Sequence, residues 1–174
     1  RVWLGGWPCA AAARYDPGDS SWVEAVVTGF SGWGGLGIGL DLLGNVWMAL
    51  AFSLPPDGRV ARIDTDTAIN TGVWDVLGNV ALGAAVGLDG DVFTVNADTN
   101  DVSRLHIDPI TLEPAPHPVT GNTVDVFPVG DVIESNGDLT GLAMHTIVRP
   151  DPEGTIFLDG FYSGSPNAWS DAVP

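Results

Sequence analysis

The chain has 174 residues, enough for one domain with a sizeable core or for several small repeats. It carries 22 acidic residues against six Arg and no Lys, for a formal net charge of −16, so neither nucleic acid nor an anionic membrane is an expected partner. With 45% hydrophobic residues the chain is too apolar to be disordered, and no charge-free run reaches the roughly 18 apolar residues of a membrane span.

Residues 1–32 predict three strands. Residues 1–4 read as the second half of a hairpin, and a second strand ends in the Asp-led turn that begins at Asp16. The Ala-rich stretch that follows Cys9 can be read locally as helix, but its position just before this turn favours a strand. A third strand is expected at 22–27. Cys9 has no second cysteine with which to pair within the chain.

Residues 33–78 predict four strands. The segment 37–48 reads as strand, tight turn and strand, with the turn at Gly44 and Asn45, because a Gly beside a short polar residue supplies the positive φ that hairpins need. A third strand ends at Arg62-Ile63-Asp64, and a fourth is expected at 73–76.

Residues 79–138 repeat this pattern. The segment 83–94 forms a hairpin around Gly90 and Asp91, a third strand ends at His106-Ile107-Asp108, and a fourth is expected at 124–127. An insertion rich in Pro, Gly and Asn occupies about 114–138. The remaining residues, 139–174, read as the opening hairpin of one more copy.

The repeat period lies in the mid-forties, which is the length of a four-stranded antiparallel sheet with its turns. The inner strands are apolar on both faces, as 46–50 shows, which indicates sheets packed face to face with neighbours. The prediction is an all-β β-propeller with about three blade-equivalents. Known propellers close with four or more blades, so either the natural chain is longer or copies assemble.

The pattern Gly-x-x-x-Asp-x-x-Gly-Asn-Val-Trp, followed by Arg-Ile-Asp, resembles the repeats of streptogramin-lyase-like and NHL-type propellers. In the lyases, that resemblance implies a His base and a Mg²⁺ ion held by Glu near the propeller axis. The corresponding positions of this chain carry Leu50, Asn96 and Asp159 and no Glu. The resemblance therefore implies a fold, and it does not transfer an activity.

The carboxylate-rich run 96–101 is the candidate metal site. Asn96, Asp98 and Asp101 offer hard oxygen ligands at loop positions, which favours Ca²⁺. The same residue types also cap turns without any metal, so both interpretations stay open. One Cys and three scattered His give no zinc or copper spacing.

His145 is the candidate general base, with a structural role as the alternative. Trp7, Trp33 and Trp169 are expected in loops rich in Gly or Ser, where an exposed ring can stack on a ligand such as a sugar or can close a gap between blades.

Two functions compete. The first is a secreted or surface-exposed module, extracellular or periplasmic, that binds a protein or glycan or assembles with other blades. The second is a metal-dependent lyase or lactonase that gathers His145, Asn96 and Asp159 around a divalent ion. The incomplete catalytic set favours the first.

Overall fold

The computed structural model describes residues 1–6, 9–30, 32–51 and 58–129, with the backbone alone for 33–36. This part of the chain contains no helix, which confirms the all-β prediction, and therefore no helix that could cross a membrane. Its strands are β1 (Val2–Gly6), β2 (Ala11–Asp16), β3 (Ser21–Val26), β4 (Trp33–Leu40), β5 (Asn45–Ala51), β6 (Arg59–Asp64), β7 (Asn70–Asp75), β8 (Ala81–Val86), β9 (Val92–Asn96), β10 (Asp101–Leu105) and β11 (Val124–Pro128).

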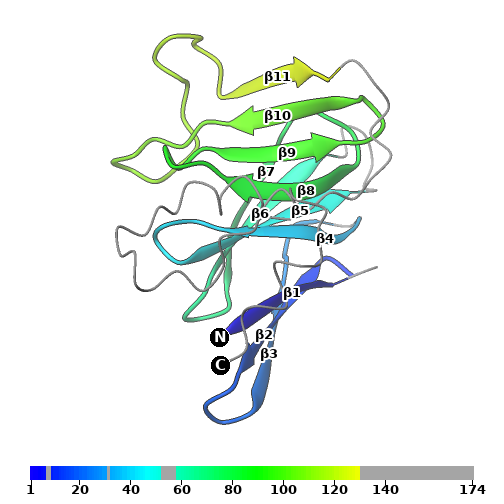
Figure 1. Ribbon diagram of the computed structural model, residues 1–174, viewed down its shortest axis with the longest axis vertical. Coiled ribbons are helices and arrows are strands. Elements are labelled where there is room, and N and C mark those ends of the chain that lie inside the picture. Colours follow the sequence, from blue (N-terminus) through cyan, green and yellow to red (C-terminus); the bar gives the residue numbers. More distant parts are fainter. Residues whose placement is uncertain (7–8, 31, 52–57, 130–174) are drawn as a thin grey trace, which may run out of the picture.

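The strands form three antiparallel sheets, each built from strands that follow one another in the sequence (Figure 1). Sheet 1 contains β1 to β3, sheet 2 contains β4 to β7, and sheet 3 contains β8 to β11. Within each sheet, every strand after the first pairs with its predecessor, so short turns suffice for most connections. The Ala-rich stretch of residues 11–13 lies in β2, as the strand reading predicts.

Both predicted hairpin turns are present. Gly44 and Gly90 have φ of +85° and +89°, a conformation that L residues with a side chain rarely adopt. β5 begins directly after Gly44, and β9 begins after one further residue, Asp91, beyond Gly90. The glycine positions in the repeat therefore fix where the chain reverses.

The same local geometry recurs in the Asp-led turns of sheets 2 and 3. The Asp64 carboxylate accepts the backbone N–H groups of Asp66 and Thr67. The Asp108 carboxylate accepts the corresponding N–H groups, two and three residues further on. A side chain that bonds its own turn in this way ends a strand without help from the rest of the fold.

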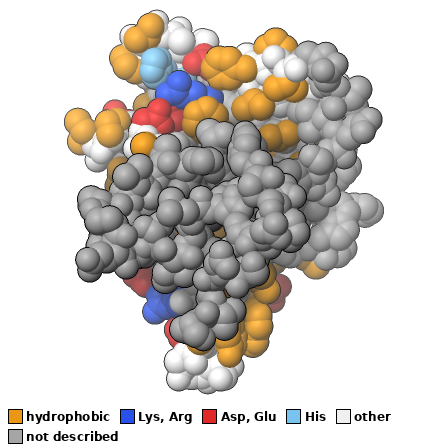
Figure 2. Space-filling view, in the orientation of Figure 1, with side chains coloured by type: hydrophobic (Ala, Val, Ile, Leu, Met, Phe, Trp, Pro, Cys, Tyr) orange, Lys and Arg blue, Asp and Glu red, His pale blue; other side chains and the backbone are white. Residues whose placement is uncertain are grey.

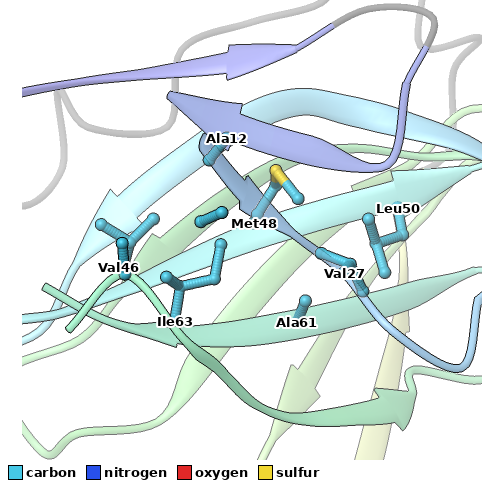
Figure 3. Close-up of a cluster of buried hydrophobic side chains, with 9 residues drawn as sticks. Ala12, Val27, Val46, Met48, Leu50, Ala61 and Ile63 are labelled. Atoms are coloured by element: carbon cyan, nitrogen blue, oxygen red, sulfur yellow. The ribbon is translucent and has the colours of Figure 1, made fainter. Parts of the chain in front are cut away.

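Sheet 2 is buried on both faces, and β5 shows how. Its residues alternate between a cluster shared with sheet 1 and a cluster shared with sheet 3. Val46, Met48 and Leu50 belong to the first cluster, where Figure 3 shows them beside residues of β2 and β6. Trp47 and Ala49 belong to the second. The unbroken apolar run at 46–50 is the sequence of a strand with a sheet against each face.

Sheets 2 and 3 approach most closely at β4 and β8. A Cβ atom on Gly37 would lie 2.5 Å from the Gly83 Cα, and one on Gly39 would lie 2.9 Å from the Ala84 carbonyl oxygen. Only glycine fits these two positions, because the neighbouring atoms are backbone and cannot rotate away. The close approach fixes β4 and β8 against each other.

Candidate functional site

Successive turns of the sheets contact one another: Arg1 pairs with both Asp16 and Asp66, and the Thr65 hydroxyl donates to the Gly44 carbonyl. We call the surface formed by turns 16–20, 41–44, 65–69 and 87–91 and by the loop 106–123 the turn face. The segments 41–44, 87–91 and 106–123 lie on the left of Figure 1. The loop 106–123, between β10 and β11, is much longer than its counterpart 65–69 in sheet 2.

A hollow of about 210 Å³ opens on the turn face between sheets 2 and 3. The two hairpin turns form one wall, and the start of the loop 106–123 forms another. Its lining is mostly apolar, with three charged side chains: Asp41, Asp89 and Arg62. The apolar lining residues include Leu42, Leu43, Trp47, Leu88, Ile107, Pro109 and Leu112.

Large apolar side chains on the turn face are exposed to solvent. The exposed fraction is 77% for Leu42, 61% for Leu43, 61% for Leu88 and 87% for Ile110. Figure 2 shows hydrophobic side chains beside charged ones and a histidine at its upper left. Tight turns are ordinarily polar, and an apolar group of this kind, contributed by two sheets around one hollow, is typical of a binding surface.

Arg14 joins sheet 1 to sheet 2. From β2, its guanidinium donates to the backbone carbonyls of Thr65 and Asp66, at 2.7 and 2.8 Å. These carbonyls belong to the turn between β6 and β7, 51 and 52 residues further along the chain. The contact links one repeat to the next.

Arg62 makes the equivalent link from sheet 2 to sheet 3. Its guanidinium donates to the Leu112 carbonyl and pairs with Glu113 at 2.7 Å, both in the loop 106–123. It also lies over the rings of Trp47 and Trp74, 5.7 and 5.1 Å from their centroids. Arg62 thus ties the wall of the hollow to β6 through hydrogen bonds, an ion pair and cation–π contacts.

His106 occupies the same motif position in sheet 3 but bonds within its own sheet. Its Nδ1 lies 2.9 Å from Asp91 Oδ2 and its Nε2 lies 2.7 Å from Asp125 Oδ2, with only 3% of the residue exposed. Both ring nitrogens therefore lie within hydrogen-bond distance of a carboxylate, and the tautomer decides which of them donates. Arg104 Nε donates to the same Asp91 carboxylate, at 2.7 Å.

This cluster anchors the loop 106–123 at its two ends. At the start, Ile107 N–H donates to Asp91 Oδ1, at 2.8 Å. At the end, the pKa of Asp125 is lowered, first by the hydrogen bond from the Asn122 side chain and then by the bond with His106. His117, from the middle of the loop, stacks on the His106 ring with centroids 4.3 Å apart. Asp91, His106 and Asp125 all form hydrogen bonds with one another or with the loop backbone. We therefore assign the cluster a structural role, which is to hold the loop 106–123 in place.

The structure places the predicted calcium ligands at the opposite end of sheet 3. Asn96 is buried, and its side-chain N–H donates to Asp101, at 2.6 Å, and to Ser103, at 2.7 Å. Asp98 is exposed. Among the described residues, no group of three or more His, Cys, Asp or Glu side chains is placed to hold a metal ion. The site predicted from Asn96, Asp98 and Asp101 stays a prediction.

Trp33 does not lie in a loop, contrary to the sequence-based expectation. It is the first residue of β4 and pairs with Ala51, because the Gly-rich stretch that follows it extends as a strand along β8. Trp7, His145, Asp159 and Trp169 lie outside the described residues. The stacking and catalytic roles assigned to these side chains stay predictions.

Sequence reasoning missed the cluster of Asp91, His106 and Asp125. One signal was available, because the residue before Ile-Asp in the repeat is Arg62 in sheet 2 and His106 in sheet 3. A change of residue type at a repeated position indicates a change of partner. The identity of those partners depends on the register of β9 and β11 and cannot be read from the motif.

No protein-family model matches the chain, and no curated protein matches it. Among solved structures, a chain of the Kuenenia stuttgartiensis hydrazine synthase is similar over 60% of this chain, with 15% sequence identity and a TM-score of 0.46. The match spans 28% of the hydrazine synthase chain. A likeness this weak carries no inference about function.

Proposed function

We propose that the three sheets are successive blades of a β-propeller, and that this part of the propeller is a secreted or surface-exposed module for binding or assembly. The consecutive antiparallel sheets, their shared turn geometry and the burial of sheet 2 on both faces support the fold assignment. The repeats resemble those of streptogramin-lyase-like and NHL-type propellers, which use the same architecture for many tasks.

The single observation that carries the binding function is the exposed apolar group around the hollow on the turn face. Leu42, Leu43 and Leu88 come from equivalent turns of two sheets, and Leu112 joins them from the long loop. Exposed leucines of this kind cost solubility, and a surface that keeps them favours contact with a partner. Loops held on a rigid sheet scaffold are common positions for such contacts.

A catalytic role is less well supported by the described residues. The buried histidine of the turn face, His106, is enclosed by Asp91 and Asp125, and its ring nitrogens are both occupied. A general base needs a nitrogen within reach of a substrate proton. The lyase alternative therefore depends on His145 and Asp159, and the binding module remains the proposal.

Selection from a random peptide library on the immobilised protein tests this function. Peptides that bind the wild type should bind the Leu42→Ser/Leu88→Ser variant at least about tenfold more weakly, because truncating central apolar contacts costs more than about 1 kcal/mol each. Leu77→Asn is the matched control. Leu77 is 60% exposed, lies outside the turn face and has a positive φ that Asn tolerates. Peptides that bind all three proteins equally, or a failure to enrich any peptide, would contradict the proposal.

A further inference from the structure

The charges around the hollow indicate which kind of partner the turn face accepts. Every arginine in the described part of the chain is already engaged with an acidic side chain or a backbone carbonyl of the same molecule: Arg1, Arg14, Arg59, Arg62 and Arg104. The chain as a whole carries a formal charge of −16. A partner that approaches the turn face therefore meets engaged cations and an excess of carboxylates.

The three charged groups that line the hollow differ in how available they are. The Asp41 carboxylate accepts hydrogen bonds from the backbone of Leu43 and Asn45 and from the Trp47 indole N–H. Arg62 has only 12% of its side chain exposed and pairs with Glu113.

Asp89 is the charged group of the lining that a partner can reach. Its side chain is 54% exposed and pairs with Arg104 at 2.8 Å. A carboxylate has two oxygens and about four acceptor positions, so a second cation can bind beside Arg104. Glu113, with 55% of its side chain exposed, adds negative charge at the neighbouring part of the loop.

The size of the hollow limits what enters it. At about 210 Å³ it is smaller than the roughly 300 to 1,000 Å³ of sites that enclose a whole small-molecule ligand. It suits one large apolar side chain, which is how anchor residues enter pockets at the centres of protein interfaces.

We infer that the hollow receives one aliphatic or aromatic side chain of a partner protein, and that Arg or Lys residues flank this anchor in the partner's sequence. The apolar lining holds the anchor, and Asp89 pairs with a flanking cation. This inference rests on the proposed binding function and adds to it the chemistry of the partner.

Three synthetic peptides that differ only in charge test the inference: acetyl-Arg-Ser-Leu-Ser-Arg-amide, the same peptide with Glu for Arg, and the same peptide with Ser for Arg. The readout is the indole N–H resonance of Trp47 in ¹⁵N-labelled protein, because Trp47 lines the hollow and its N–H donates to Asp41, another lining residue. The Arg peptide should bind about tenfold more tightly than the Glu peptide, and the difference should shrink as salt rises from about 50 to about 500 mM.

Asp89→Asn and Asp75→Asn form a matched pair for the same titration. Asp75 pairs with Arg59 at 2.7 Å with 51% of its side chain exposed, but it lies at the end of β7 away from the turn face. We expect Asp89→Asn to weaken the Arg peptide several-fold and Asp75→Asn to leave it unchanged.

The outcomes separate the inference from the function on which it rests. If the Arg and Ser peptides bind equally and the two Asn variants behave alike, the partner's anchor is apolar without a cationic flank, and the inference is wrong while the binding function stands. If the Leu42→Ser/Leu88→Ser variant binds the Arg peptide as well as the wild type does, the peptide is attracted by the net negative charge of the protein and not by the hollow. That result would overturn both.

Discussion

Sheets 2 and 3 have the same strand order and a glycine with positive φ in the first hairpin turn, yet the residue before Ile-Asp makes different contacts in the two sheets. In sheet 2 this residue, Arg62, leaves its own sheet and binds the loop of the next. In sheet 3 it is His106, which stays within its sheet and binds Asp91 and Asp125. The long, flexible guanidinium side chain spans the gap between sheets, and the shorter imidazole does not.

The comparison shows how one repeat position serves two purposes. Where the neighbouring sheet offers free carbonyls, an arginine at this position fixes two sheets together, as Arg14 and Arg62 do. Where the sheet must hold its own long loop, a histidine between two carboxylates anchors that loop. The repeated backbone sets the position, and the side chain decides which contact is stabilised.

The largest expected effect is a difference in stability between variants of two equivalent aromatic residues, Trp47 of β5 and Phe93 of β9. Trp47 is 1% exposed between sheets 2 and 3, whereas Phe93 is only partly buried. Trp47→Ala should lower the free energy of unfolding by about 3 to 5 kcal/mol, because it leaves a cavity in the core. Phe93→Ala should cost roughly half as much. Urea unfolding followed by circular dichroism measures both, and equal losses would show that the two sheets are packed alike.

A second prediction compares the residues that follow the two turn glycines. Asp91→Ala should cost about 3 kcal/mol, because it leaves Arg104 and His106 without their shared carboxylate. Asn45→Ala, which removes one hydrogen bond to Asp41, should cost about 1 kcal/mol.

Amide hydrogen exchange distinguishes an anchor from a general loss of stability in Asp91→Ala. The loop 106–123 should lose protection more than β4 to β7 do. Uniform loss across all sheets would contradict the role of Asp91 as an anchor of this loop.

Arg62→Lys tests the link between sheets. Lysine keeps the charge but loses the planar fork that binds Leu112 and Glu113 and the stacking over two Trp rings, so a loss of about 1 to 2 kcal/mol is expected. Arg59→Lys is the control, because Arg59 pairs with a half-exposed Asp75 and should lose less than about 1 kcal/mol. Thermal unfolding of the two variants side by side measures the difference, and a larger loss in Arg59→Lys would count against the link.

The smallest effect concerns the turns that the two sheets share. The pKa of Asp64 is lowered from the ordinary 3.8, first by the Thr67 hydroxyl, and the pKa of Asp108 is lowered first by the Thr111 N–H. A lowered folded-state pKa means that this stabilisation is complete above pH 3.8 and is lost as pH falls through the folded-state value. The melting temperature should therefore drop between about pH 5 and pH 2.

The Asp64→Asn/Asp108→Asn variant should show a shallower drop than the wild type, because Asn keeps the turn geometry without titrating. Identical slopes for the two proteins would assign the acid sensitivity to other carboxylates.

Local features of the fold could be predicted from the sequence, and contacts between repeats could not. The positions of Gly44 and Gly90 and the apolar run at 46–50 each encode a turn or a strand through their own chemistry. The partners of Arg62 lie 50 and 51 residues away, and they are determined by how sheets 2 and 3 pack. Trp33 was expected in a loop for the same reason. The residues after it are rich in Gly, and the sequence does not reveal that they form a strand packed closely against β8.

The reach of Arg14 has a consequence for the order in which the chain becomes stable during synthesis. Its acceptors, the carbonyls of Thr65 and Asp66, are added to the chain 51 and 52 residues later. At a synthesis rate of roughly 5 to 20 residues per second, about 3 to 10 s pass between the addition of Arg14 and the addition of its acceptors. Sheets 1 and 2 are thus each stabilised by the sheet that follows, and nascent chains released before residue 65 should be digested by protease faster in β2 than chains released after sheet 2 is complete.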